Sequence, residues 1–222
     1  MNAHTPGQGG GEDDRAARRG VALRREPRQQ RSRERVERIL DAAVDLAVRE
    51  GYEAATTTRI AQHAGVGLAT LYGFFTDRRA IFRAASARNL EAFADRVDQL
   101  VTRVGFEHWW DAAAAGFDEY VRMSRADPGF RVVSFGGVAD ERLLTEGRRN
   151  DEVVADRLAS LIAVRFGTGT DERTRTALLT AVVAGDALVK LAFERDPVEG
   201  DPAVLTEARR VVQGILERGA PG

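Results

Sequence analysis

The chain has 222 residues, 43% of them hydrophobic, so it can bury a substantial core in one unit or in two. Its 33 basic and 34 acidic residues give a net charge of −1, which gives no hint of a nucleic-acid partner because it averages away any local patch. The absence of cysteine excludes disulfides, thiolate catalysis and cysteine metal sites, and the lack of a long apolar run or a hydrophobic secretory segment predicts a cytoplasmic protein with no membrane partner.

Residues 1–30 are expected to form a disordered arm. They contain three consecutive glycines, two prolines and many charges but almost no large apolar side chain, so they cannot offset the entropy of ordering. The arm is rich in arginine: from Arg15 to Arg38 there are ten arginines against three glutamates. This excess of positive charge lies directly ahead of the segment described below.

An amphipathic helix is predicted from about Arg31 to the glycine at position 51. Its apolar stripe consists of Val36, Ile39, Leu40, Ala43, Leu46 and Ala47. We interpret this helix as the support of a small domain.

The stretch from Thr56 to Phe75 has the pattern of a DNA-binding helix-turn-helix, with two short helices joined at a glycine. The first helix is expected to begin with Thr57 as its cap, and Gly65 stands where a tight corner needs positive φ. The second helix is expected over about residues 68–75. Its predicted buried side chains are Leu71, Phe74 and Phe75, and its outward positions are Leu68, Ala69, Thr70, Tyr72 and Gly73.

The motif resembles the signature of the tetracycline-repressor (TetR) family of transcription regulators. The resemblance covers roughly residues 31–82 and is carried by Ile60-Ala61, Ala64-Gly65-Val66, Thr70-Leu71-Tyr72, Phe75, Arg78 and Arg79. It implies an all-α fold in which an N-terminal three-helix DNA-binding domain is joined by a long helix to a helical domain that binds an effector and dimerises. The corresponding boundaries are 1–30 for the arm, 31–76 for the DNA-binding domain and 77–222 for the effector and dimerisation domain.

The remaining helices follow from apolar periodicity and from breaks at proline and glycine. A long connecting helix is predicted to begin at an Asp77 cap and to close at Gly105. Five further helices are expected at about residues 106–125, 129–135, 140–165, 171–194 and 202–218. No stretch alternates long enough to predict a strand.

The expected DNA-binding residues are Thr57, Thr58, Arg59, Gly67, Leu68, Ala69, Thr70, Tyr72, Gly73 and Arg78. The resemblance implies phosphate contacts for the threonine, tyrosine and basic positions, with a solvated surface charge as the alternative for Arg78. The second helix carries no charge, so specificity is expected from Thr70, apolar contacts to thymine methyl groups and DNA shape. The arginine-rich arm either enters a neighbouring minor groove or is a solubilising tail without contacts.

An effector site is expected where aromatic residues gather between Phe106 and Phe130, although an ordinary core is the alternative for each of them. The expected ligand-binding residues are Phe106, Trp109, Trp110, Phe117, Tyr120 and Asn150. Asp151, His108 and Asp111 are further polar candidates for one hydrogen bond to the ligand, and for these three and Asn150 the alternative is a solvated or capping polar residue. The aromatic density predicts an apolar or aromatic small molecule, and no metal or other cofactor is expected.

The last two predicted helices are apolar enough to form a four-helix interface in a homodimer. Its expected residues are Leu179, Val182, Val183, Val189, Val212 and Leu216, and Asp186 is either paired in that interface or faces water. Two-fold symmetry then predicts a palindromic double-stranded DNA operator.

The leading hypothesis is a homodimeric repressor that a small effector releases from DNA. An activator, or a regulator without an effector, is the alternative. An enzyme is disfavoured because the sequence has no phosphate loop, no metal-ligand cluster and only three scattered histidines. A sequence-indifferent DNA-binding or protein-binding module is a further alternative.

Overall fold

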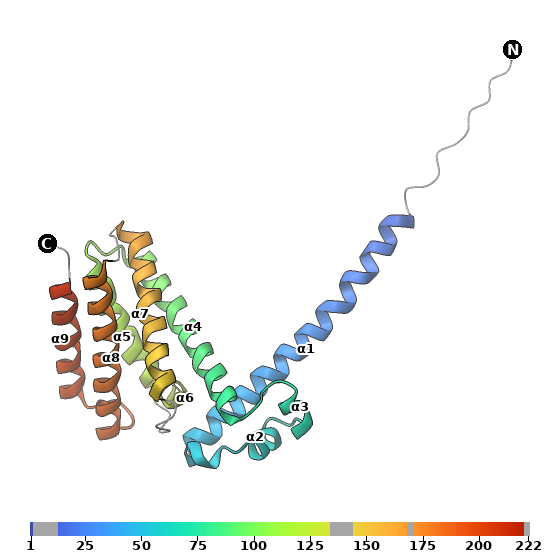
Figure 1. Ribbon diagram of the computed structural model, residues 1–222, viewed down its shortest axis with the longest axis horizontal. Helices are drawn as coiled ribbons and strands as arrows, with labels where there is room; N and C mark the ends of the chain where they lie inside the picture. Colours follow the sequence, from blue (N-terminus) through green and yellow to red (C-terminus); the bar gives the residue numbers. More distant parts are fainter. Residues whose placement is uncertain (2–12, 134–143, 168–170, 220–222) are drawn as a thin grey trace.

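The computed structural model describes residues 1, 13–133, 144–167 and 171–219, with the backbone alone for 13–28 and 144–150. Every regular element in these ranges is a helix, which confirms the predicted all-α fold (Figure 1). A small N-terminal unit and a larger helical bundle are joined by one long helix, α4.

The N-terminal unit consists of α1 (Asp13–Glu50), the 3-10 turn η1 (Tyr52–Ala54), α2 (Thr57–His63) and α3 (Leu68–Tyr72). Its helices meet over a core that also takes in the first turns of α4. That core includes Ile39, Leu46, Ile60, Leu71, Phe75, Ile81 and Phe82. Burial of these side chains fixes α2 and α3 against α1, so the two short helices need little stability of their own.

The first helix is longer than predicted, because α1 begins at Asp13 and not near Arg31. The expected arm therefore has to be corrected to end before residue 13, and residues 2–12 lie outside the described part of the chain. Arginine, alanine and leucine fill much of residues 13–30, and all three are favourable in helices. Their helical preference outweighs the glycine and the proline that suggested an irregular segment.

The connecting helix α4 spans Arg78–Val104, as the sequence predicted. The Asp77 carboxylate accepts a hydrogen bond from the backbone N–H of Ala80 at 2.7 Å, and Gly105 ends the helix in the left-handed region with φ 66°. Arg88 ties the helix to α1 through Glu37 at 2.7 Å and Asp41 at 2.8 Å. The start of α4 therefore belongs mechanically to the N-terminal unit.

The helical domain contains α5 (Trp109–Ala126), α6 (Pro128–Val133), α7 (Leu144–Phe166), α8 (Glu172–Arg195) and α9 (Pro202–Gly219). These bounds lie close to the predicted ranges, apart from residues 134–143, which are not described. Apolar side chains from α4, α5, α7, α8 and α9 share one core, with Phe93, Trp109, Leu178 and Leu216 among its members.

The short helix α6 belongs to both cores. Phe130 packs in the core of the helical domain, whereas Val133 is buried in the core of the N-terminal unit. Figure 1 shows α6 at the end of the helical bundle nearest to α1. A Cβ placed on Gly129 would lie 2.6 Å from Cγ1 of Val44, so α6 and α1 approach closely at this point. Besides α4, α6 is thus a second connection between the two units.

By length and composition α8 is also apolar enough to cross a membrane, although no such run was expected from the sequence. Its buried residues include Leu178, Val189 and Phe193, which lie in the core of the helical domain. We therefore interpret α8 as a core helix.

Candidate DNA-binding surface and effector cavity

The N-terminal cap of α2 is Thr56 and not Thr57. The Thr56 side chain accepts from the backbone N–H of Arg59 at 3.4 Å, and its extended backbone places it just outside the helix. Thr57 is the first helical residue, and its Oγ1 lies 3.1 Å from the phenol oxygen of Tyr72. Three threonines in succession made the choice of cap ambiguous in the sequence.

The outer side of α3 is open to solvent over its whole length. Leu68 is 40% exposed and Tyr72 is 51% exposed, and Gly67, Ala69, Thr70 and Gly73 are exposed as well. Leu71 and Phe75 are buried beneath them, as predicted. The prediction that Phe74 is buried is wrong, because it is 36% exposed; α3 ends at Tyr72, so Phe74 no longer follows its helical face.

Two predicted phosphate-binding arginines are engaged within the N-terminal unit. Arg59 forms a two-point ion pair with Glu50, with distances of 2.6 and 2.8 Å, which lowers the pKa of the Glu50 carboxyl. The guanidinium of Arg78 stacks over the Tyr52 ring at 4.1 Å and donates to the carbonyls of Tyr52 and Glu53. These contacts hold α2 on α1 and η1 on α4.

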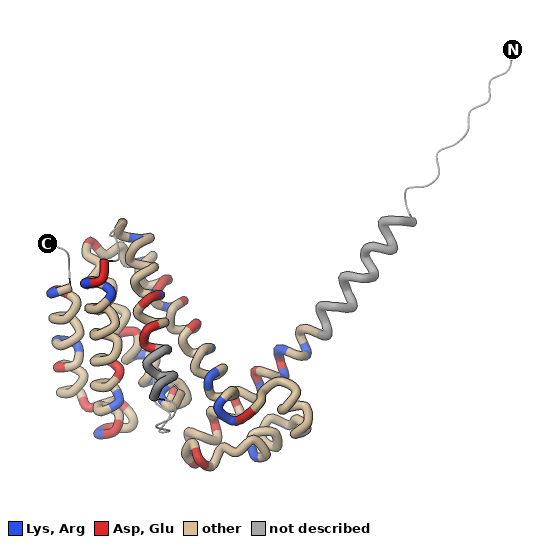
Figure 2. Tube along the Cα trace, viewed as in Figure 1, with Lys and Arg blue, Asp and Glu red and all other residues tan. Residues whose placement is uncertain are grey.

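Exposed positive charge is carried by α1. Arg31, Arg33, Arg35 and Arg38 are exposed on its described part. Figure 2 shows basic residues there and at the start of α4, and none on α3. Thr58 is also exposed, at the start of α2. The uncharged helix α3 thus has basic side chains on neighbouring helices. In such an arrangement the basic side chains can contact phosphates while the uncharged helix contacts base edges.

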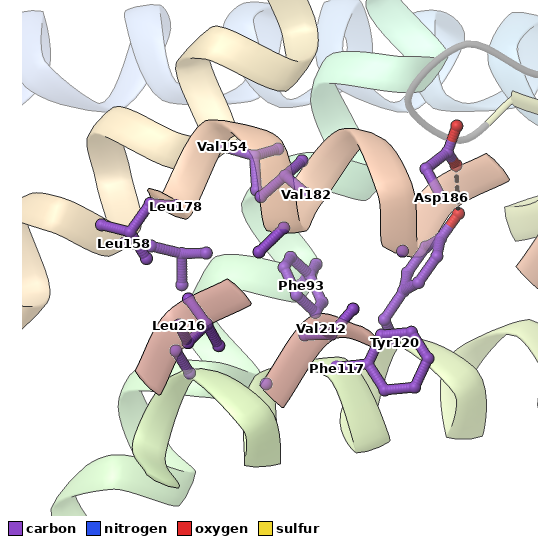
Figure 3. A pocket seen from close by; sticks show the side chains of 14 residues that line it. Phe93, Phe117, Tyr120, Val154, Leu158, Leu178, Val182, Asp186, Val212 and Leu216 are labelled. Atoms are coloured by element: carbon purple, nitrogen blue, oxygen red, sulfur yellow. Dashed lines mark hydrogen bonds between the residues drawn. The ribbon is translucent and has the colours of Figure 1, made fainter. Parts of the chain in front are cut away.

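The helical domain encloses a small apolar cavity of about 50 Å³. Its walls come from α4, α5, α7, α8 and α9 (Figure 3). The lining residues are Phe93, Ala113, Gly116, Phe117, Tyr120, Val154, Leu158, Leu178, Ala181, Val182, Gly185, Asp186, Val212 and Leu216.

Of the predicted ligand-binding residues, Phe117 and Tyr120 line this cavity. Trp109 is buried in the same core and Trp110 and Phe106 pack at its margin, but none of the three borders the cavity. The side chain of Asn150 lies outside the described residues. Most of the residues that line the cavity were not predicted. Valines and leucines that border a cavity cannot be distinguished in a sequence from those that pack tightly.

One end of the cavity is polar. Asp186 is 7% exposed; its Oδ1 accepts from the Tyr120 hydroxyl at 2.7 Å and its Oδ2 lies 2.5 Å from Lys190 Nζ. Figure 3 shows Tyr120 and Asp186 at this end and Leu158, Leu178 and Leu216 at the opposite one. Neither sequence expectation for Asp186, an interface residue or a water-facing one, is correct, because the side chain belongs to the chain's own interior.

A second carboxyl lies beside the polar end. Asp151 is 8% exposed and its Oδ1 has no hydrogen-bond partner among the described residues. It precedes Val154 by one turn of α7, so the two share a face of that helix; Val154 lines the cavity, and Asp151 lies just beyond its lining. Burial and the charge of Asp186 raise its pKa to about 7, against the opposing effect of Lys190. Within the described residues no three histidine, aspartate or glutamate side chains group to hold a metal ion.

The predicted dimer residues separate into two sets. Val189, Val212 and Leu216 are at most 3% exposed and pack in the core of their own chain, so their assignment to a dimer interface is corrected. Val183 is 46% exposed, and Leu179 and Val182 are half-buried. Leu191 and Val211, which the sequence analysis did not select, are 42% and 37% exposed on α8 and α9.

A helix-turn-helix unit joined through α4 and α6 to a larger helical domain is the architecture of a helix-turn-helix transcription regulator. The family models agree with this class. Residues 39–85 match bacterial regulatory proteins of the tetR family, and residues 107–220 match the tetracyclin repressor-like C-terminal domain. The chain belongs to the TetR family of transcriptional regulators.

Characterised relatives are regulators as well. The chain is 28% identical over 184 residues to the HTH-type transcriptional regulator AlkX of Mycobacterium tuberculosis, covering 81% of this chain and 84% of AlkX. It is 33% identical over 129 residues to the transcriptional repressor KstR of Mycolicibacterium smegmatis, covering 58% of this chain and 55% of KstR.

Solved structures share the fold. A TetR-family transcriptional regulator from Streptomyces coelicolor superposes with a TM-score of 0.70 at 36% identity, covering 84% of this chain and 99% of the other. FadR from Bacillus subtilis, solved in complex with stearoyl-CoA, has a TM-score of 0.59 at 16% identity, covering 83% of this chain and 99% of FadR. At that identity the likeness to FadR concerns the fold alone.

Proposed function

We propose that this protein is a homodimeric repressor that binds a palindromic operator and leaves it when a small, apolar effector enters the cavity of the helical domain. The proposal depends on one observation: the chain has both an apolar cavity and a solvent-exposed helix α3, which we take as the recognition helix. Helices α4 and α6 connect the two parts. It acts in the cytoplasm, as a regulator and not as an enzyme.

On the DNA side, α3 enters the major groove with Leu68, Ala69 and Thr70 toward base edges. Gly67 and Gly73 allow close approach at its two ends. Thr57, Thr58, Tyr72 and the arginines at positions 59 and 78 lie around it as phosphate contacts. The uncharged face of α3 supports readout of thymine methyl groups and of DNA shape in place of arginine–guanine pairs.

The size of the cavity supports a mechanism of release. A volume of about 50 Å³ is far below the roughly 300 Å³ at which small-molecule sites usually begin, so an effector has to push the surrounding helices apart. Tyr120 borders the cavity and packs edge-on against Phe130 of α6, with ring centroids 5.6 Å apart. Expansion at Tyr120 therefore displaces α6, and with it α1, to which α6 is closely packed.

Such a displacement changes the spacing of the two recognition helices in a dimer. The effector favours the expanded form and DNA the compact form, and each therefore weakens binding of the other. The proposed contacts between the two chains are the exposed apolar residues Val183, Leu191 and Val211 of α8 and α9, together with the half-buried Leu179. Val182, which borders the cavity, extends this face.

The test is selection of duplexes from a random pool by the purified protein at moderate ionic strength. We expect a palindrome with half-sites about one helical turn apart, from which random duplex does not displace the protein. Recovery of unrelated sequences, displaced equally well by random DNA, would contradict the proposal. Transcription from the selected operator, with and without the protein, then distinguishes a repressor from an activator.

A further inference from the structure

Asp151 is a buried carboxyl beside the polar end of the cavity, one turn of α7 from the lining residue Val154, and the described residues supply no partner for its Oδ1. Both oxygens of Asp186 have partners, Tyr120 for one and Lys190 for the other. Asp151 has an oxygen that is shielded from solvent and accepts nothing, in a side chain that is 92% buried. A buried polar group without a partner destabilises the fold, and a ligand that supplies the missing partner would remove that cost.

The local charges indicate which kind of ligand fits. Asp186 and Glu152 are acidic neighbours of Asp151, and the basic neighbour, Lys190, already pairs with Asp186 at 2.5 Å. Among the described residues, none is thus left to compensate the negative charge of an ionised Asp151. A ligand anion would meet two carboxylates here, whereas a cation would compensate the extra charge in a medium of low dielectric.

The lining of the cavity indicates the chemistry of the rest of the ligand. The end far from Asp186 is formed by Leu158, Leu178 and Leu216, and the polar side chains that line the cavity are Tyr120 and Asp186 (Figure 3). We propose that the effector is an apolar amine carrying one positive charge, whose hydrocarbon body occupies the cavity and whose ammonium group binds Asp151. The inference rests on the proposed effector site and adds the chemical class of the effector.

Three probes with the same hydrocarbon body distinguish charge from hydrophobicity: 4-phenylbutylamine, 4-phenylbutanol and 4-phenylbutyrate. Binding to the full-length protein is measured by calorimetry in the absence of DNA. We expect the amine to bind most tightly at pH 8. Equal binding of the three probes, or preference for the carboxylate, would overturn the proposal.

Two variants test whether Asp151 binds the ammonium group of the ligand. In Asp151→Asn the amine should lose about tenfold or more in affinity while the alcohol changes little. Asp156→Asn, which makes the same substitution on the exposed side of α7 at a carboxylate that pairs with Arg175, is the matched control and should leave amine binding unchanged. If Asp151→Asn folds, as judged by its thermal transition, and still binds the amine with full affinity, the assignment of Asp151 is wrong.

The pH dependence gives an independent readout. The groups facing Asp151 are Asp186 and Lys190 of α8, with Glu152 on its own helix, and the raised pKa of about 7 makes the ionised form of Asp151 scarce at pH 6. Because the amine stays protonated throughout, its affinity should rise about tenfold between pH 6 and pH 8 in the wild type and stay flat in Asp151→Asn. A flat wild-type profile would contradict the ion pair.

The site itself and the regulatory function are tested separately. Val182→Phe should fill the cavity and abolish binding of the amine and of the alcohol; unchanged amine binding would show that the ligand lies elsewhere and overturn the proposal. Release of the selected operator by 4-phenylbutylamine is then followed by fluorescence anisotropy. Binding that depends on Asp151 but does not release DNA supports the amine site and contradicts the proposed function.

Discussion

The Thr57 hydroxyl and the Tyr72 phenol lie 3.1 Å apart, and this pair joins the first residue of α2 to the last residue of α3. Both side chains reach the surface, Tyr72 with half of its area exposed. The contact sets the separation of the two helices at their outer side. It also presents two hydroxyls on the side of the helix-turn-helix that we propose faces the DNA backbone.

Tyr72→Phe is expected to weaken operator binding by about fivefold, which corresponds to the loss of about one neutral hydrogen bond. Because no charge is removed, the slope of log affinity against log salt should not change. Thr206→Val, which removes a hydroxyl from the exposed side of α9, is the control. Equal operator binding by the two variants, measured by fluorescence anisotropy, would exclude a phosphate contact from Tyr72.

Arg78 has a structural role that can be separated from its proposed DNA contact. Arg78→Ala removes a guanidinium that stacks on Tyr52 and donates to two carbonyls, and it should lower the free energy of unfolding by about 1–2 kcal/mol. Arg33→Ala, on the exposed side of α1, should change stability by less than about 0.5 kcal/mol. Urea titrations give both values.

The proposed phosphate contact of Arg78 adds a second expected effect. The salt slope of operator binding should fall by about 1 in Arg78→Ala. A loss of stability with an unchanged slope would assign Arg78 to the fold alone.

The existence of most helices, and the ends of several, could be predicted because their signals are local; the start of α1 and the end of α3 could not. Asp77 and Gly105 mark the two ends of α4, and Pro202 marks the start of α9, each through backbone chemistry that needs no knowledge of the rest of the chain. The helix-turn-helix was predictable for the same reason, since Gly65 adopts φ 64° at its corner.

The cavity and the outer face of α8 could not be predicted to the same degree, because both depend on how helices are rotated against each other. Val183 and Val189 stand on one helix and are equally apolar, yet Val189 is 2% exposed and Val183 is 46% exposed. Packing of α8 on α9 decides this difference. The pairing of Tyr120 with Asp186 likewise joins residues 66 positions apart.

Because α6 approaches α1 closely, we predict that one added methyl group at their contact lowers the stability of the fold. Gly129→Ala places a Cβ 2.6 Å from Val44 and should destabilise the fold by about 1–3 kcal/mol. The double variant with Val44→Ala should recover most of this loss. Gly116→Ala is the matched control, since the nearest atom, on Val97, is 3.7 Å away. Additive losses in the double variant, measured by thermal unfolding, would show that the two helices are not in contact in solution.

The exposed apolar face of α8 predicts the oligomeric state. Leu191→Asp puts a charge at a position that is 42% exposed and should convert the proposed dimer into a monomer. Val164→Asp makes the same change on α7, where the side chain is 82% exposed, and should remain dimeric. Sedimentation velocity distinguishes the outcomes. A dimeric Leu191→Asp variant would remove this face from the proposed interface.

The raised pKa of Asp151 predicts that the stability of the protein depends on pH even without a ligand. Its pKa of about 7 in the folded chain exceeds the value of 3.8 expected when unfolded, so between these pH values the folded protein holds a proton that the unfolded chain releases. The contribution of Asp151 to stability therefore falls as pH rises from about 4 to 7. Asp151→Asn abolishes this dependence and should be more stable than the wild type by about 1–3 kcal/mol at pH 8, with the difference shrinking toward pH 4. Urea titrations across this range measure it, with the exposed Asp156→Asn as control, and a constant difference between Asp151→Asn and wild type would show that the Asp151 carboxyl titrates normally.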